Sequence, residues 1–125
     1  AEFPRIDDRL AMGRHQHGFL ATASRRQRGD GGLFHEITHI DLDSGHQQVW
    51  DAGFGSGVSE PVFVERSKQA DEGAGWLLAT VYEPDRHTSS LVVIDAMAVA
   101  DGPVATVRLD HRVPFGFHGS WRPAA

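Results

Sequence analysis

Histidine is the residue type in this sequence with the greatest capacity for chemistry. A neutral imidazole is the commonest metal ligand in proteins, and it also transfers protons near neutral pH. The chain has 125 residues and no cysteine, so thiolate metal sites, cysteine nucleophiles and disulfides are excluded. The eight histidines are His15, His17, His35, His39, His46, His87, His111 and His118. Their number alone does not define a site, so their spacing and neighbours must be considered.

One histidine pair has the spacing of a zinc metalloprotease motif. Residues 35–39 match H-E-x-x-H, in which His35 and His39 could share a zinc ion only on a helix. A helix holds the two rings about 6 Å apart on one face, whereas four residues of strand separate them by about 13 Å. The β-branched residues and the strict alternation over residues 33–42 favour a strand. We therefore expect solvent-facing strand histidines here and no protease site.

The pair His15 and His17 is a weaker candidate for metal binding than His118. His15 and His17 form an H-x-H pair, which some metal sites use, but this spacing is frequent by chance and favours a structural or surface role. His118 lies in the segment V-P-F-G-F-H-G-S-W at residues 113–121. Aromatic neighbours, and glycines that allow close backbone approach, suit an imidazole that points into a dry cavity. From these residues alone, His118 is either a satisfied buried histidine or a metal ligand.

Glu60 is a carboxylate in an apolar context. It begins the segment E-P-V-F-V at residues 60–64, where an unpaired carboxylate would be costly. We expect it to have a partner, either at a sheet edge or on the ring of a metal-binding histidine. Glu2 raises the same question more weakly, because it lies near the first residue of the chain.

The charge balance excludes one class of partner. Lys and Arg number 12 against 17 Asp and Glu, which gives a net charge of −5. Binding to nucleic acid requires a surplus of clustered basic residues, so we expect no nucleic-acid partner. The one basic cluster, at residues 25–28, is typical of a solvated loop. No apolar window approaches the length of a membrane span, and no basic start precedes an apolar stretch. We therefore expect a cytoplasmic protein without a signal peptide or a transmembrane segment.

Short segments with β-type periodicity must position these side chains. Glycines and prolines, 14 and 6 in number, separate the segments. The near-continuous apolar runs at residues 76–82 and 91–94 predict strands that are buried on both faces. The predicted strands are residues 17–24, 33–41, 47–52, 60–66, 75–83, 88–96, 103–110 and 113–118. Only residues 95–100 could hold a helical turn. The pattern predicts an all-β, antiparallel single domain, either a sandwich, a barrel or two four-stranded propeller blades.

Three motifs occur in a fixed order along the chain. They are E-F-P-R-I-D at residues 2–7, S-E-P-V-F-V at 59–64 and F-H-G-S-W at 117–121, with the strand pair 75–96 between the second and third. Together they resemble the C-terminal part of the carotenoid cleavage oxygenases. That family includes apocarotenoid and stilbene-cleaving dioxygenases and the retinoid isomerase. The resemblance covers essentially all of residues 1–125. It implies that the chain is a C-terminal fragment formed by the last two blades of a seven-bladed β-propeller.

The resemblance also implies a metal centre. In this family iron(II) is held by four histidines, one iron per full-length chain. His118 would be one ligand, and the other three would lie outside this chain. Glu60 would accept a hydrogen bond from the ring of His118, which fixes the tautomer that binds the metal. Glu2 would orient a histidine upstream of this chain in the same way.

The reaction implied is oxygen-dependent cleavage of a conjugated carbon–carbon double bond to two carbonyl products. The partners would be O₂, an apolar carotenoid, apocarotenoid or stilbene-like substrate, and the remainder of the propeller. Phe115, Phe117 and Trp121 flank His118 and would line or support the substrate cavity, although core packing explains them as well. The fragment alone would be inactive. The alternative from another class is a non-catalytic all-β binding domain.

Overall fold

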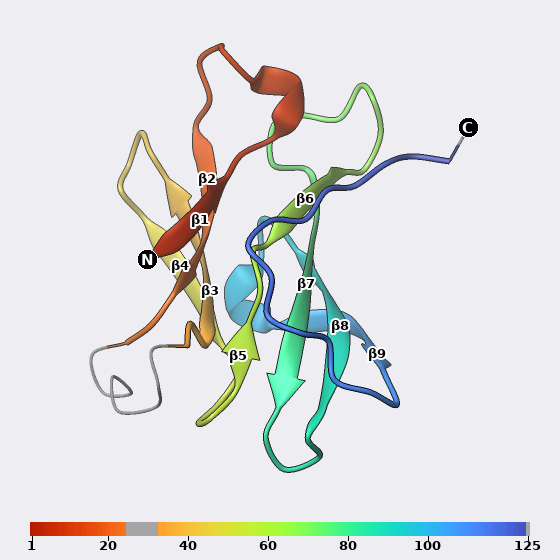
Figure 1. Ribbon diagram of the computed structural model, residues 1–125. Helices are drawn as coiled ribbons and strands as arrows, with labels where there is room; N and C mark the ends of the chain where they lie inside the picture. Colours follow the sequence, from red (N-terminus) through yellow and green to blue (C-terminus); the bar gives the residue numbers. More distant parts are fainter. Residues whose placement is uncertain (25–32, 125) are drawn as a thin grey trace.

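The computed structural model describes residues 1–24 and 33–124, which form two antiparallel β-sheets (Figure 1). The N-terminal sheet has the strand order β1 (Glu2–Arg5), β2 (His17–Thr22), β3 (Glu36–Asp41) and β4 (Gln47–Asp51). The C-terminal sheet contains β5 (Gly57–Val58), β6 (Val62–Glu65), β7 (Gly75–Glu83), β8 (Thr88–Asp95) and β9 (Pro103–Arg108). The antiparallel all-β prediction is therefore confirmed.

The helical content of the described ranges is two short 3₁₀ turns. These are η1 (Asp8–Leu10) and η3 (Val99–Asp101), and the second falls at the end of the segment in which the sequence allows a helical turn. Neither approaches the length or apolar character that a helix needs to cross a lipid bilayer, and no other helix in the described ranges does. The basic cluster at residues 25–28 lies outside the described residues.

Alternation and turn chemistry explain the N-terminal sheet. Strand β3 pairs with β2 in a register that sets Ile37 opposite Ala21, and both side chains are fully buried. The strand ends in a turn where Asp41 Oδ1 accepts hydrogen bonds from the backbone N–H groups of Asp43 and Ser44, both at 3.0 Å. The Ser44 N–H and the Gln16 side chain lower the pKa of the Asp41 carboxyl by stabilising its charged form. The turn is therefore best held when Asp41 is ionised.

The edge of the C-terminal sheet is interrupted in the middle. Strands β5 and β6 both pair with β7, with Val58 opposite Val81 and Val62 opposite Leu78. The edge thus carries one residue more than β7 over this stretch, and Pro61 has no N–H to donate to the ladder. The sheet has five strands where four were predicted, because Gly57–Val58 forms a separate short strand that was not predicted. The strand expected at residues 60–66 begins only at Val62.

The core lies between the two sheets. Phe19 of β2 and Phe63 of β6 stack with their ring centroids 5.6 Å apart and their planes 4° from parallel. The other fully buried members come from both sheets, Ile37 on one side and Leu77 and Ile94 on the other. One face of β7 is buried here while the opposite face is half-buried, so the prediction of burial on both faces is met only in part. Removal of these apolar side chains from water is the main term that holds the sheets together.

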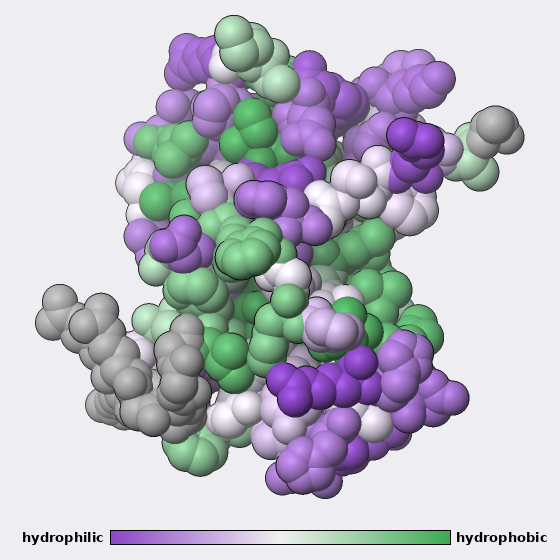
Figure 2. Space-filling model, in the orientation of Figure 1, coloured by the Kyte–Doolittle hydropathy of each residue, from purple (hydrophilic) through white to green (hydrophobic). Residues whose placement is uncertain are grey.

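After β9 the chain crosses the face of the C-terminal sheet and passes beside β6 (Figure 1). The strand predicted at residues 113–118 does not form. The N–H of Val113 donates to the Ser89 Oγ at 3.0 Å instead of to a neighbouring strand, and Pro114 has no N–H at all. We call residues 113–121 the C-terminal segment. Figure 2 shows hydrophobic side chains gathered over the middle of this face.

Candidate functional site

Three parts of the chain meet at the carboxylate of Glu60. This residue lies in the interruption between β5 and β6, and its side chain is only 4% exposed. Its Oε1 atom is 3.2 Å from Nδ1 of His118, and its Oε2 atom accepts a hydrogen bond of 2.8 Å from the N–H of Gly119. Oε2 also accepts a bond of 3.4 Å from Nη1 of Arg5 at the end of β1. Glu60 is therefore not an unpaired carboxylate, and the ring of His118 is one of its three partners.

The hydrogen bond to Glu60 determines which nitrogen of His118 is free. An ionised carboxylate only accepts hydrogen bonds, so Nδ1 carries the proton and the lone pair remains on Nε2. A neutral imidazole with a free Nε2 is the form that binds a metal ion. The side chain of His118 is 76% exposed, so the expectation of a dry surrounding cavity is wrong for the described residues. The C-terminal segment lies on the outside of its sheet, and few side chains cover the ring.

Phe3 is the aromatic side chain that packs on this imidazole. Its ring meets the ring of His118 edge to face, with centroids 5.9 Å apart and an interplanar angle of 89°. Strand β1 has an irregular register between Glu2 and Arg5, and Phe3 adopts a φ of 56° there. This φ lies in the left-handed region, where a non-glycine residue is strained. In this backbone conformation the Phe3 ring contacts the rings of His118 and Phe34. Sequence reasoning gave Phe3 and Arg5 no role, although both lie in the motif at residues 2–7.

The aromatic residues proposed for a substrate cavity lie around two cavities beneath the C-terminal segment. These cavities have volumes of about 310 and 170 Å³ and share several lining residues, among them Ser59, Thr80 and Phe117. Trp121 and His118 line the larger cavity, and Phe115 lines the smaller. The side chains of Phe115, Phe117 and Trp121 remain 48, 78 and 49% exposed. They are therefore available to contact an apolar molecule and are not part of the core.

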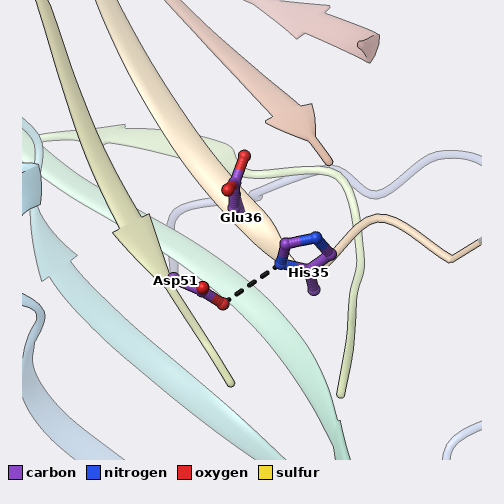
Figure 3. A group of neighbouring side chains, drawn as sticks. All are labelled: His35, Glu36 and Asp51. Atoms are coloured by element: carbon purple, nitrogen blue, oxygen red, sulfur yellow. Dashed lines mark hydrogen bonds and ion pairs between the residues drawn. The ribbon is translucent and has the colours of Figure 1, made fainter. Parts of the chain in front are cut away.

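His35 is buried, so the prediction of a solvent-facing side chain is wrong. Its exposed fraction is 1%, because this face of the strand points between the two sheets. Nδ1 lies 3.1 Å from Oδ1 of Asp51 (Figure 3). Nε2 accepts a hydrogen bond of 3.3 Å from the N–H of Ser24. Glu36 completes a group whose ligand atoms lie within 4.8 Å of one another, the only such group of three in the described ranges. Since both ring nitrogens are hydrogen-bonded, the group is explained as a polar network that fixes the start of β3.

His39 and His17 form a second buried contact that the sequence did not predict. Nε2 of His39 lies 3.1 Å from Nδ1 of His17, and their exposed fractions are 2 and 9%. The ring of His39 also stacks on Phe19, with centroids 5.3 Å apart. Burial is the main cause that lowers the pKa of His39, and the charge of a protonated His17 lowers it further. His39 lies in β3, so the strand prediction for the H-E-x-x-H segment is confirmed and its prediction of a solvent-facing side chain is wrong.

Residues 1–123 match the protein family described as retinal pigment epithelial membrane protein, RPE65. The chain belongs to the RPE65 family. Lignostilbene-alpha,beta-dioxygenase isozyme III of Sphingomonas paucimobilis is 34% identical over 99% of the chain. The match spans 27% of that enzyme, so the chain covers about a quarter of the length of the curated relatives it matches.

Solved structures of RPE65 family members have the same arrangement of strands. The lignostilbene dioxygenase of Pseudomonas brassicacearum superimposes with a TM-score of 0.88 at 32% identity, covering 98% of this chain and 27% of that one. A cobalt-substituted Synechocystis ACO superimposes with a TM-score of 0.89 at 29% identity, covering 98% and 25%. ACO is an apocarotenoid oxygenase. The resemblance noted in the sequence is thereby confirmed at the level of family and fold.

The donor set present in this RPE65 family chain fits a single ligand and not a complete metal centre. His118 offers a free Nε2 atom, held by its hydrogen bond to Glu60. Within residues 1–24 and 33–124, His118 belongs to no group of three potential ligands. Glu2 lies exposed at the start of β1, opposite Ala21 of β2. Further ligands for a metal at His118 would therefore have to come from outside the described residues.

Proposed function

We propose that this chain is the C-terminal part of a longer, metal-dependent oxygenase that cleaves a carbon–carbon double bond in an apolar conjugated substrate. The hydrogen bond between His118 and Glu60 carries the proposal, because it presents one imidazole nitrogen in the state that binds a metal. Membership of the RPE65 family supports it, as do the names of the relatives, which are oxygenases. The two sheets would be the last two blades of a seven-bladed propeller, and the remainder of the propeller would be the chain's main partner.

His118 would be one of four histidine ligands of an iron(II) ion, and the other three would lie outside this chain. Glu60 would keep the proton of His118 on Nδ1 and raise the basicity of Nε2. Glu2 would act in the same way on a histidine of the missing part. Iron held in this way supplies the one-electron chemistry that allows O₂ to react with an organic substrate.

The substrate would lie against exposed apolar side chains near His118. Phe115, Phe117 and Trp121 would line or support its cavity, and their exposure suits a polyene or stilbene-like molecule. In the overall reaction the double bond is broken, each carbon takes one oxygen atom of O₂, and two carbonyl products leave. The cytoplasmic location expected from the sequence stays a prediction.

The test is removal of the proposed ligand from the full-length protein. His118→Ala should abolish both retention of iron, measured by elemental analysis after anaerobic loading, and cleavage of stilbene-like and apocarotenoid substrates. His111→Ala is the matched control, because the ring of this histidine is exposed and its ring nitrogen Nδ1 pairs with the neighbouring Asp110. Normal iron content and activity in His118→Ala would contradict the proposal. A folded full-length protein that takes up no iron and cleaves nothing would favour the non-catalytic binding domain.

A further inference from the structure

We infer that Arg5 is a positioning residue of the metal centre, fixing the carboxylate of Glu60 and, through it, the ring of His118. The inference rests on the function proposed above and goes beyond it, because it assigns a role to a residue that offers no ligand atom. Three observations carry it: the charge that Arg5 places beside Glu60, the backbone of Gly119 that the two residues bind together, and the anchoring of Arg5 itself.

The first observation concerns the charge of Glu60. A carboxylate that is 4% exposed needs compensation, since burial of an unpaired charge is strongly unfavourable. Nη1 of Arg5 lies 3.4 Å from Oε2, and the Arg5 side chain is itself only 18% exposed. Among the described residues, Arg5 is the one permanently charged cation within 4.0 Å of this carboxylate. Arg5 therefore provides the opposite charge beside the buried carboxylate and restrains it where its other oxygen atom meets the ring of His118.

The second observation is that Arg5 and Glu60 together bind both backbone polar groups of one residue, Gly119. The N–H of Gly119 donates to Oε2 of Glu60 at 2.8 Å, and the carbonyl oxygen of Gly119 accepts from Nη1 of Arg5 at 3.1 Å. Gly119 directly follows His118, so this clamp fixes the backbone that carries the proposed ligand. The clamp matters because His118 is 76% exposed and few packing contacts restrain its ring. Without this clamp on Gly119, the ring of His118 would be held by its contacts with Glu60 and Phe3 alone.

The third observation is that Arg5 is anchored on the other sheet. It ends β1, where it lies opposite Phe19 of β2, and its Nη2 atom donates to Oδ2 of Asp8 at 3.2 Å. The guanidinium thus bonds three acceptors that come from β1–η1, the β5–β6 interruption and the C-terminal segment. A planar guanidinium makes such divergent bonds in fixed directions, whereas a lysine ammonium has a flexible stem and one charged atom. Arg5 therefore links the N-terminal sheet to Glu60 and Gly119, and so fixes where His118 lies relative to that sheet.

The test compares Arg5→Met with Arg9→Met in the full-length protein. Arg9 is a matched control, since it pairs with Asp7 and donates to the carbonyl oxygens of Ser67, Lys68 and Ala70 at 3.0–3.2 Å, so it makes as many contacts but none of them to Glu60. Both variants should lower the unfolding temperature. Only Arg5→Met should weaken the binding of iron(II) and cobalt(II), measured by competition with a chelator, by about 10- to 100-fold, the range usual for a residue that orients a ligand.

A readout without metal separates positioning from general stability. In the metal-free protein labelled with ¹⁵N-histidine, His118 should be protonated on Nδ1 in the parent and in Arg9→Met, and become a mixture of tautomers in Arg5→Met. Arg5→Lys keeps the positive charge but loses the planar guanidinium with its several N–H donors, so its metal affinity should lie between those of the parent and Arg5→Met. If Arg5→Met does not fold, Arg5→Lys replaces it in the comparison. Metal affinity within twofold of the parent in both Arg5 variants, with an unchanged His118 tautomer, would overturn the inference. If His118→Ala keeps its iron, the proposed function itself fails. If His118→Ala loses its iron while both Arg5 variants keep theirs, only the role of Arg5 is refuted.

Discussion

The Nδ1 atom of His118 lies 3.2 Å from Oε1 of Glu60, although 58 residues of chain separate the two. The contact exists because the edge of the C-terminal sheet is interrupted at Glu60, which frees its carboxylate from a strand position. The C-terminal segment then returns across the sheet and places His118 beside it (Figure 1). An irregular edge and a returning segment together build the site, while the regular strands β7 and β8 supply the rigid support.

Glu60→Gln tests whether the charge of the carboxylate matters or only its shape. The amide has nearly the same size but can present an N–H group to Nδ1, and it has no charge to favour the proton there. We expect metal affinity and kcat/KM of the full-length protein to fall about 10- to 100-fold, with the unfolding temperature changed far less. Asp85→Asn, at an exposed turn, is the control for loss of one negative charge. Unchanged kcat/KM and metal affinity in Glu60→Gln would leave Glu60 as a structural residue.

Gly75 should tolerate no side chain. A Cβ atom added there would lie 2.2 Å from the carbonyl oxygen of Val64 and 2.9 Å from the ring of Phe63. Gly75→Ala must therefore push β6 away from β7, and overpacking of this kind costs about 1–3 kcal/mol of unfolding free energy. Gly116→Ala is the matched control, because a Cβ there meets nothing within 4 Å. Equal denaturant midpoints for the two variants would contradict the geometry at Gly75.

Phe19 should be the most costly aromatic side chain to remove. It is fully buried, and its ring lies between the ring of Phe63 on one sheet and that of His39 on its own. Phe19→Ala leaves a cavity between the sheets and should lower the free energy of unfolding by about 3–5 kcal/mol. Phe54→Ala removes a ring that is 76% exposed and should change it by less than about 0.5 kcal/mol. Urea unfolding followed by tryptophan fluorescence measures both values.

Regular strands could be predicted from the sequence because their signal is local. The strand at Gly75–Glu83 was predicted with its observed bounds, since an apolar run between turn residues is sufficient evidence for a buried strand. Strand β1 was missed because four residues containing Pro4 and a positive φ at Phe3 have no periodic pattern. Residues 113–118 alternate like a strand, yet their N–H groups find no neighbouring edge. Pairing partners are not encoded within a short segment.

The site could be predicted only through motifs, and only in part. Glu60 stood out because a carboxylate in an apolar segment needs a partner, and His118 stood out through its aromatic and glycine neighbours. Their contact could not be derived from spacing, since it depends on a crossing segment. The burial of His35 and His39 was missed for a related reason. Alternation shows that His39 in β3 and His35 just before it lie on the same face, but only the position of the second sheet shows that this face is inside.

The buried pair of His39 and His17 should make stability depend on pH. The pKa of His39 in the folded chain is below its ordinary value of about 6.5, chiefly through burial and then through the charge of His17, with His46 acting in the same direction and Asp41 opposing it. Below about pH 6.5 the unfolded chain therefore binds more protons at this residue than the folded chain does. The stabilising contribution is fully present above pH 6.5 and is lost as the pH falls toward the folded pKa.

Urea midpoints measured between pH 8 and pH 5 should therefore decline below about pH 6.5. His39→Leu fills the same space without a titrating ring, so its midpoint should depend less on pH even if it is lower at pH 8, where the hydrogen bond to His17 is missing. His111→Gln, at a ring that is 66% exposed, should keep the parent's decline. A decline of the same size in His39→Leu would assign the pH dependence to other groups, because no proton can then bind at position 39.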